Sequence, residues 1–360
     1  MRLKGLDIAL VSSISLLILL GLLNLYSATF GEKDIFFYKQ IAWIVLGGII
    51  CVVVAFYDYH RIVERSNYLY LGGLLLLALV LFIGKGAGGA RRWLSMFGFS
   101  LQPSEFMKPI MIVLFSKILS ARGSIDRWGD VVELLFYAAF PALLIAKEPD
   151  LGTSAVIFSF FFFYLFLSAS RLRFFFTPLL LSLGSFPILW GFLKDYQKRR
   201  LLVFLNPNYD PLGAGYNLLQ SKISLGSGGV LGVGFLKGLQ HRLRFLPEHH
   251  TDFIFCVWGE EFGFVGTSFL LLIYLFVIWR LYQIALLSKD REGFYIAAGV
   301  AFLFFIHVFV NVGMTLGLTP VKGLPLPFFS YGGSSSLSMM ICMGLAVSVY
   351  RHRFSKEDLA

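Results

Sequence analysis

Charged residues are scarce in this sequence. Asp, Glu, Lys and Arg together make up 14% of the 360 residues, whereas soluble domains carry about 25%. Hydrophobic residues reach 57%, and the mean hydropathy is +0.76. This composition excludes a soluble globular fold. It indicates an integral membrane protein, which we expect to form a single polytopic domain over residues 1–360.

Cysteine is also rare, and no C-x-x-C pair occurs. Cys51, Cys256 and Cys342 stand far apart in apolar surroundings, which argues against a disulfide framework and against a zinc site. No small-residue cleavage site follows the first apolar run, so that run is expected to be an uncleaved span. The basic residues are scattered over many loops and form no single stripe, which argues against a nucleic-acid partner.

Long apolar runs are abundant in the chain. About 20 apolar residues cross a bilayer, and about ten such runs are expected, near residues 7–26, 36–56, 67–84, 105–120, 131–146, 152–169, 173–193, 262–287, 294–317 and 331–350. Most short basic loops fall on the same side as the two termini, which the positive-inside rule places in the cytoplasm. The predicted fold is therefore an all-α polytopic membrane protein. Its N- and C-termini are cytoplasmic, and a large extracytoplasmic loop, residues 194–261, joins helices 7 and 8.

The outer loops nevertheless carry many cations. Lys85, Arg91 and Arg92 lie in the loop before the fourth span, and the long loop holds further Lys and Arg residues, including Lys222. Cations placed against the topological preference need another reason. A phosphate-bearing lipid headgroup on the outer face supplies one, and peripheral contact with anionic lipids is the alternative.

The segment that closes the long loop concentrates ionisable side chains. Residues 246–263 read L-P-E-H-H-T-D-F-I-F-C-V-W-G-E-E-F-G. A carboxylate at the edge of an apolar pocket can have its proton affinity tuned for acid–base work, and we expect Asp252 to be that group. A metal site built on His249, His250 and Asp252 is the alternative. H-H-x-D lacks the i, i+4 spacing of helical zinc motifs, so a single carboxylate base is the more economical hypothesis, without metal ligands from the protein.

The fourth span opens with Q-P-S-E-F-M-K-P, residues 102–109. Ser104 is expected at the N-cap and Glu105 in the first turn. Glu105 and Lys108 are three residues apart, so they share a helix face and can pair. Ionisable groups at membrane depth usually line a cavity, and a pair that only orients the helix is the alternative. Just upstream lie an interfacial indole and two guanidinium groups, which match phosphate oxygens, from Trp93, Arg91 and Arg92.

Four further polar features have structural explanations. The turn at residues 147–152 reads K-E-P-D-L-G and is expected to be solvated; a contribution of Glu148 and Asp150 to a polar cavity is the alternative. The glycine-rich run 226–234 lacks a P-loop ending and predicts a flexible loop or close backbone packing. Residues 320–335 hold too many Pro and Gly for a regular span, so they are expected to form a re-entrant segment lining a cavity. His307 and Asn311 lie one turn apart in the ninth span and are expected to form interhelical hydrogen bonds.

Taken together, these motifs resemble one protein family. R-R-W-L, Q-P-S-E-x-x-K, E-P-D-L-G-T, G-Y-N-x-x-Q-S-K, G-S-G-G, L-P-E-H-H-T-D-F-I-F, G-E-E-F-G-F-x-G and G-L-P-L-P-F-F-S-Y-G-G-S-S occur in the order found in the shape, elongation, division and sporulation (SEDS) family. The similarity covers essentially the whole chain. The G-Y-N and L-P-E-H-H-T-D segments are closer to the elongation branch, whereas Lys322 before G-L-P-L-P is closer to the division branch.

The resemblance implies a peptidoglycan glycosyltransferase of the bacterial cytoplasmic membrane. Such an enzyme polymerises lipid II on the outer leaflet during cell elongation and works with a class B penicillin-binding protein, a transpeptidase. The family's essential loop aspartate falls on Asp252. Its conserved Glu and Lys fall on Glu105 and Lys108, and its arginine–tryptophan element on Arg92 and Trp93. The remaining residues expected to bind substrate are Arg91, Gln220, Lys222, His249 and His250.

The implied reaction needs a base for the acceptor hydroxyl and cations for the departing diphosphate. Asp252 is the candidate base, and Arg91, Arg92, Lys108 and Lys222 are candidate cations. Mg²⁺ or Mn²⁺ is a possible aid to the diphosphate. Two other functions remain open at this point. A lipid II flippase would also use intramembrane charges, although the polar residues here concentrate on the outer side, and a non-catalytic scaffold for cell-wall synthases needs no chemistry of its own.

Overall fold

The long apolar runs of the sequence fold into long helices. The protein is described by a computed structural model over residues 6–30, 35–84, 92–96, 99–211, 213–239, 243, 245, 250–321 and 323–353. Within these residues, eight helices are long and apolar enough to cross a membrane: α1 (Ile8–Ala28), α2 (Ile35–Phe56), α4 (Ser66–Ile83), α6 (Trp128–Lys147), α7 (Leu151–Ser168), α13 (Ile254–Leu286), α14 (Arg291–Leu316) and α15 (Gly333–His352).

The other two predicted spans are a polar helix and a broken one. The helix α5 (Pro103–Arg122) has 20 residues but is far less apolar. The seventh run is divided at Ser185 into α8 (Leu172–Gly184) and α9 (Phe186–Phe192). All ten runs therefore fold as helices close to their predicted positions, and the polytopic all-α prediction is confirmed. The exception in extent is α13, which begins about eight residues before the predicted start at residue 262.

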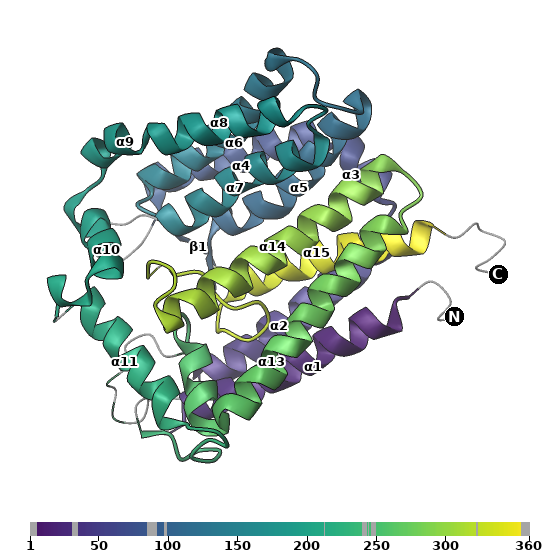
Figure 1. Ribbon diagram of the computed structural model, residues 1–360. Helices are drawn as coiled ribbons and strands as arrows, with labels where there is room; N and C mark the ends of the chain where they lie inside the picture. The colour runs from purple at the N-terminus through teal and green to yellow at the C-terminus, as the bar shows by residue number, and fades with distance from the viewer. Residues whose placement is uncertain are drawn as a thin grey trace.

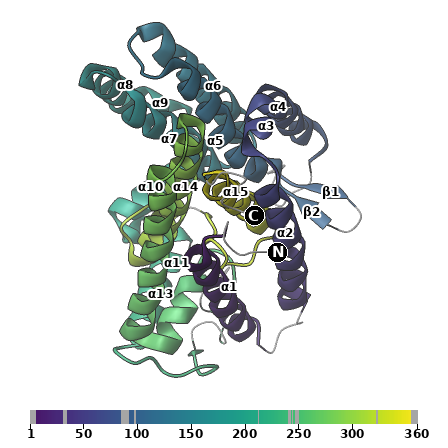
Figure 2. The same ribbon diagram turned by 90° about the vertical axis from the view of Figure 1, so that its right-hand side faces the viewer.

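Short elements connect the long helices. They are α3 (Tyr59–Glu64), α10 (Asp195–Leu205), the 3-10 turn η2 (Pro207–Tyr209), α11 (Ala214–Ser227), and the antiparallel strands β1 (Leu94–Met96) and β2 (Phe99–Leu101). Figure 1 shows α10 and α11 running along one end of the bundle, from α9 to the start of α13. In Figure 2 the β1–β2 hairpin projects beside α2 and α4.

Aspartates define several helix starts. The carboxylate of Asp7 accepts from Leu10 N at 3.1 Å, and that of Asp290 accepts from Gly293 N at 2.8 Å, so each satisfies an otherwise unpaired N–H of the first turn. The prediction for α5 was slightly wrong. Gln102 occupies the N-cap, Pro103 follows at the first helical position, and Ser104 is buried within the first turn. Proline suits that position because its missing N–H has no helical partner there.

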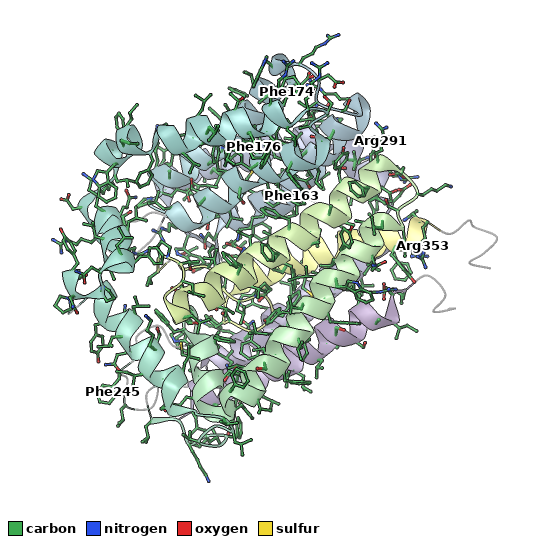
Figure 3. All side chains as sticks on the ribbon, viewed as in Figure 1. Phe163, Phe174, Phe176, Phe245, Arg291 and Arg353 are labelled. Carbon is green, nitrogen blue, oxygen red and sulfur yellow. The ribbon has the colours of Figure 1, made fainter. Side chains whose placement is uncertain are left out.

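Among the eight apolar helices, α14 and α15 are the most buried, since 67% and 83% of the residues in their apolar 18-residue stretches are enclosed by the protein. They pack against α5, α2 and α13, whereas outer helices such as α4 expose large apolar side chains, including Leu75 and Phe82. Arg291 and Arg353 lie at the end of the bundle where α1 begins and α15 ends, and Phe245 lies towards the opposite end (Figure 3). The first of these ends is the predicted cytoplasmic face.

Candidate active site

Asp252 lies two residues before α13, at the end of the bundle opposite the predicted cytoplasmic face. It lines a cavity of about 400 Å³, here called the polar cavity. The lining also includes three other residues that the sequence analysis singled out, Arg92, Trp93 and Glu105. Side chains from the hairpin, α5, the start of α13 and the 323–335 segment thus meet in one place, although they are far apart in the sequence.

A second cavity adjoins the first. It has a volume of about 370 Å³ and shares Arg92, Asp150 and Asp252 with the polar cavity. It continues towards α10, where Arg200 and Tyr196 line it. We call it the bridging cavity, because it shares Leu151, Leu193 and Gln197 with a third, mainly apolar groove of about 700 Å³. Asp252 therefore stands where the polar and bridging cavities meet.

Residues on α14 and the 323–331 segment hold the backbone around Asp252. Asn311 Nδ2 donates to the carbonyl oxygen of Asp252 at 3.1 Å and to that of Leu324 at 2.8 Å. Ser330 Oγ donates to Thr251 O at 2.7 Å, and Tyr331 N donates to His250 O at 3.0 Å. The irregular 323–331 segment therefore lies buried against the loop that carries Asp252 and lines the cavity, as predicted from its Pro and Gly content.

Glu105 and Lys108 form a buried ion pair on α5. Lys108 Nζ donates to Glu105 Oε1 at 2.6 Å, and the Lys108 side chain is fully enclosed. Lys108 Nζ also lies 3.1 Å from His307 Nε2 on α14. Glu105 Oε2 is buried without a hydrogen-bond partner among the described residues, although Glu105 lines the polar cavity. Glu105 is therefore the member of the pair that lines the polar cavity, and Lys108 is not among the lining residues.

Arg92 is tied to the turn between α6 and α7. Its Nε donates to Glu148 O at 2.9 Å, and its Nη2 donates to Pro149 O. Asp150 accepts from Thr153 N at 3.1 Å and from Gln102 Nε2 at 3.0 Å. These bonds fix a guanidinium group at the junction of the two cavities.

The prediction that this turn is solvated was wrong. Asp150 is 8% exposed and Glu148 is fully buried. Within the part of the chain that the structure describes, neither carboxylate oxygen of Glu148 has a hydrogen-bond partner. Burial, followed by the charge of Asp150, raises the pKa of Glu148 to about 8, and Arg92 opposes this shift. Segments far away in the sequence enclose the turn: Arg92 and Gln102 form hydrogen bonds to it, and Leu324 packs beside Gly152.

The acidic pair Glu260–Glu261 lies inside α13 and not at the end of a loop, as the sequence analysis had placed it. Glu260 Oε1 accepts from Leu239 N at 2.6 Å, and Glu261 Oε1 accepts from Leu236 N at 3.1 Å. Buried carboxylates can be accommodated in this helix because backbone N–H groups of the long loop bind them.

Gly263 breaks the hydrogen-bond ladder of α13 with φ 64°. The freed carbonyl groups of residues 260 and 261 accept from Val233 N and Gly234 N, both at 3.0 Å, and the freed N–H groups of residues 264 and 265 donate to Gly229 O and Val230 O. Of the two interpretations offered for the glycine-rich run, close backbone packing is the one observed. The run and the kink form a unit that we call the kink clamp, residues 229–234 and 260–265.

The remaining residues predicted to bind substrate do not gather at the two cavities, as far as the structure describes them. His250 packs its ring 4.8 Å from that of Phe36. Gln220 and Lys222 lie on α11, and neither lines the polar or the bridging cavity; Lys222 packs against Gly317 at the end of α14. Arg91 and His249 lie outside the described residues.

Sequence reasoning considered a cavity role for Asp150 only as the alternative to a solvated turn, and it placed Tyr331 in the segment expected to line a cavity. It did not single out Arg200 as a lining residue. Asp150 had a usable signal, because D-x-x-T before an apolar run is an N-cap pattern and implies an ordered turn. Arg200 was one of the loop cations for which an anionic ligand was proposed, but its place in the bridging cavity depends on how α10 folds back over the bundle.

Comparison with known proteins agrees with this architecture. Residues 6–355 match the family of FtsW, RodA and SpoVE, described as cell cycle proteins. The chain is 41% identical over 347 residues to peptidoglycan glycosyltransferase MrdB of Escherichia coli, covering 94% of this chain and 93% of that protein.

Two solved structures also match the chain. One belongs to a peptidoglycan synthase complex that coordinates polymerization and crosslinking, with a TM-score of 0.84, 31% identity and coverage of 98% of this chain and 99% of that one. The other is the rod shape determining protein RodA of Thermus thermophilus, with a TM-score of 0.74, 30% identity and coverage of 98% of each chain.

Proposed function

The chain belongs to the SEDS family, which comprises FtsW, RodA and SpoVE, and from this membership we propose that it polymerises lipid II at the outer face of the cytoplasmic membrane, with Asp252 as the general base. It is a peptidoglycan glycosyltransferase of the RodA type and a multi-pass bacterial inner-membrane protein, active in cell elongation. The substrate and the roles of individual residues are argued below.

The position of Asp252 between two cavities carries the proposal. Glycosyl transfer between two lipid-linked disaccharides needs two sugar sites that meet at one base. The polar cavity suits the acceptor sugar, and the bridging cavity suits the donor. The Asp252 carboxylate takes the proton of the acceptor 4-hydroxyl while that oxygen forms a bond to the donor anomeric carbon. The bond from that carbon to the diphosphate breaks, and attack opposite the leaving group inverts the anomeric centre.

The departing diphosphate needs a cation near the same junction. Of the candidates proposed from the sequence, Arg92 lines both cavities, whereas Lys108 is fully enclosed and paired with Glu105. Arg200 lines the bridging cavity from α10. We therefore assign the leaving-group role to Arg92 and Arg200, whose planar forks suit phosphate oxygens.

The apolar groove supplies a place for the polyprenyl tail. It is lined by α6 and α7 side chains, including Ala142, Ala155 and Phe158, and adjoins the bridging cavity through Leu151. A donor with its tail in this groove carries its diphosphate towards Arg92. This arrangement favours a lipid-linked donor over a soluble nucleotide sugar.

A divalent cation fits this scheme only as a companion of the diphosphate. Within the described part of the chain, which leaves out His249, no group of three or more His, Cys, Asp or Glu side chains is arranged so that it could hold a metal ion. We propose that Mg²⁺ or Mn²⁺, where used, takes most of its oxygen ligands from the diphosphate and water. Asp150 lines both cavities and offers a carboxylate to such an ion.

A partner enzyme completes the proposal. The similar chain in the solved synthase complex belongs to an assembly that coordinates polymerization and crosslinking. We propose that this protein likewise works with a class B penicillin-binding protein, which crosslinks the strands that it makes.

Polymerisation of purified lipid II tests the proposed function. The full chain is assayed with its penicillin-binding partner as wild type, Asp252→Asn and Asp252→Ala, with Asp126→Asn on an exposed turn as the matched control. We expect glycan strands from wild type and Asp126→Asn and none from either Asp252 variant. Equal product from all four would remove Asp252 from the mechanism. No product from wild type, combined with lipid II translocation in proteoliposomes, would favour a flippase.

A further inference from the structure

We propose that His307 is a positioning residue for glycosyl transfer, acting through Lys108 to aim Glu105 into the polar cavity. This inference rests on the proposed function. His307 lies on α14, is fully buried and does not line the polar or the bridging cavity. It therefore acts through its neighbours and not on the substrate.

Three buried ionisable side chains form a chain of contacts. Lys108 Nζ lies 2.6 Å from Glu105 Oε1 and 3.1 Å from His307 Nε2. His307 Nδ1 lies 2.9 Å from Pro325 O. Lys108 and His307 are 0% exposed and Glu105 is 4% exposed, so these partners, and not bulk water, hold the groups in place.

The contacts define the tautomer of His307. A carbonyl oxygen can only accept, so Nδ1 must carry the hydrogen that bonds to Pro325 O. Nε2 of the neutral ring is then an acceptor, and it meets the ammonium group of Lys108, which can only donate. A second proton on the ring would place two cations 3.1 Å apart. The arrangement therefore holds His307 neutral and Lys108 charged.

The orientation of Glu105 follows from that of Lys108. The ammonium group binds Oε1. Oε2 is buried and has no partner among the residues that the structure describes, in a residue that lines the polar cavity together with Asp252. A buried unsatisfied carboxylate oxygen is costly, so its retention points to a substrate hydroxyl as its missing partner. Without the acceptor on His307, the ammonium group of Lys108 loses one of the two contacts that orient it. The Glu105 carboxylate is then no longer held in a single orientation.

A buried histidine can also act only by filling space, and two variants distinguish these roles. In His307→Gln the amide can place an acceptor near the Nε2 position and restore the contact to Lys108, while the bond to Pro325 is lost. In His307→Asn the shorter amide can restore the donor to Pro325 and loses the contact to Lys108. His307→Leu removes both contacts and keeps the site filled.

The experiment measures kcat and KM for lipid II polymerisation by the complex with the penicillin-binding partner, and the Tm of each variant. We expect His307→Asn and His307→Leu to lose kcat by about 10- to 100-fold, as small misplacements near reacting groups do. KM should stay close to wild type, and His307→Gln should recover most of the rate. Thr315→Val, which loses only the bond from Thr315 Oγ1 to Val312 O within α14, is the matched control and should match wild type.

Three results would overturn the proposal. They are equal rates for Gln, Asn and Leu variants, rates that fall in proportion to Tm, and an active Asn variant beside an inactive Gln variant, which would place the effect at Pro325. Failure of the wild type to polymerise lipid II would instead reject the proposed function itself, and the two failures are therefore distinguishable.

Discussion

Asn311 binds the backbone of Asp252 from the neighbouring helix. Its Nδ2 donates to Asp252 O at 3.1 Å and, with its other hydrogen, to Leu324 O at 2.8 Å. Asn311 is fully buried, and no described residue forms a hydrogen bond with its Oδ1. The amide must be oriented in this way because both neighbours are carbonyl oxygens, which can only accept. A single side chain thus sets the distance between the loop that carries the proposed base and the segment that lines the cavity.

Asn311→Leu should therefore reduce polymerisation more than it reduces substrate affinity. Leucine has a similar size but cannot donate, so two buried carbonyl groups lose their partner and the Asp252 loop can shift. We expect kcat to fall by about 100-fold with KM within a few-fold of wild type. Asn208→Ala, in the exposed turn η2, is the control and should be unaffected. An Asn311→Leu enzyme with wild-type kcat would show that Asp252 is positioned without this contact.

Glu148 makes the stability of the protein depend on pH. Its pKa is raised from 4.5 to about 8, chiefly by burial, so the folded protein holds a proton that the unfolded chain releases above pH 4.5. The stability from this proton is fully present below pH 4.5 and is lost as pH rises through 8. Glu148→Gln keeps a neutral side chain at every pH. We expect it to match the wild-type Tm at pH 5 and to exceed it by several degrees at pH 8.5.

Thermal unfolding of both proteins across this pH range tests the prediction. Glu64→Gln, at the exposed end of α3, controls for the general loss of a negative charge and should not change the pH dependence. If Glu148→Gln lowers the Tm at pH 8.5, Glu148 is ionised in the folded protein and its charge is stabilising.

Gly232 allows the kink clamp to close. Its φ is +83°, and an added Cβ would overlap the carbonyl group of Glu261. Gly232→Ala should therefore separate residues 229–234 from the kink at Gly263 and free the N–H groups that bind Glu260 and Glu261. We expect a lower Tm and faster proteolysis within the long loop.

Gly226→Ala is the matched control for this prediction. Gly226 is in the helix α11 and has open space around the position of a Cβ, so alanine should be neutral or slightly stabilising there. Equal protease sensitivity in the two variants would show that the clamp does not hold the loop.

The sequence predicted the spans well because their signal is local. A run of apolar residues of bilayer length is visible without knowledge of its neighbours, and the ten runs all became helices. Charged side chains are also conspicuous in an apolar chain, and three of those proposed from the sequence, Arg92, Glu105 and Asp252, line one cavity. Their roles in the reaction stay predictions.

The errors concern features that depend on distant partners. Glu148 is charged and adjacent to Pro149, which is typical of a solvated turn, yet segments far away in the sequence bury it. Glu260 and Glu261 were predicted to end the long loop because two acidic residues are unfavourable in an apolar helix. The N–H groups of loop residues 236 and 239 donate hydrogen bonds to these carboxylates, and no local sequence pattern predicts this pairing. His307 and Asn311 were expected to bond between helices, but their partners in the 323–326 segment could not be inferred.

Ala155 provides the sharpest test of the apolar groove. It lies on α7, is exposed and lines the groove of about 700 Å³ that adjoins the bridging cavity. Ala155→Trp should fill part of this volume and leave the packed side of α7 unchanged. If the groove holds the polyprenyl tail of the donor, the KM for long-chain lipid II should rise about 10-fold, because about 1.4 kcal/mol of apolar contact is lost. The value of kcat should change little, since the atoms around Asp252 are untouched.

A donor with a short prenyl chain makes this test specific. Such a chain does not reach far into the groove, so Ala155→Trp should affect its KM much less than that of the long-chain substrate. Leu75→Trp, on an exposed face of α4, adds an equally large side chain elsewhere and should leave both KM values unchanged. Equal effects of Ala155→Trp on the two donors would mean that the groove does not bind the prenyl tail. The donor lipid would then have to enter the bridging cavity from another side.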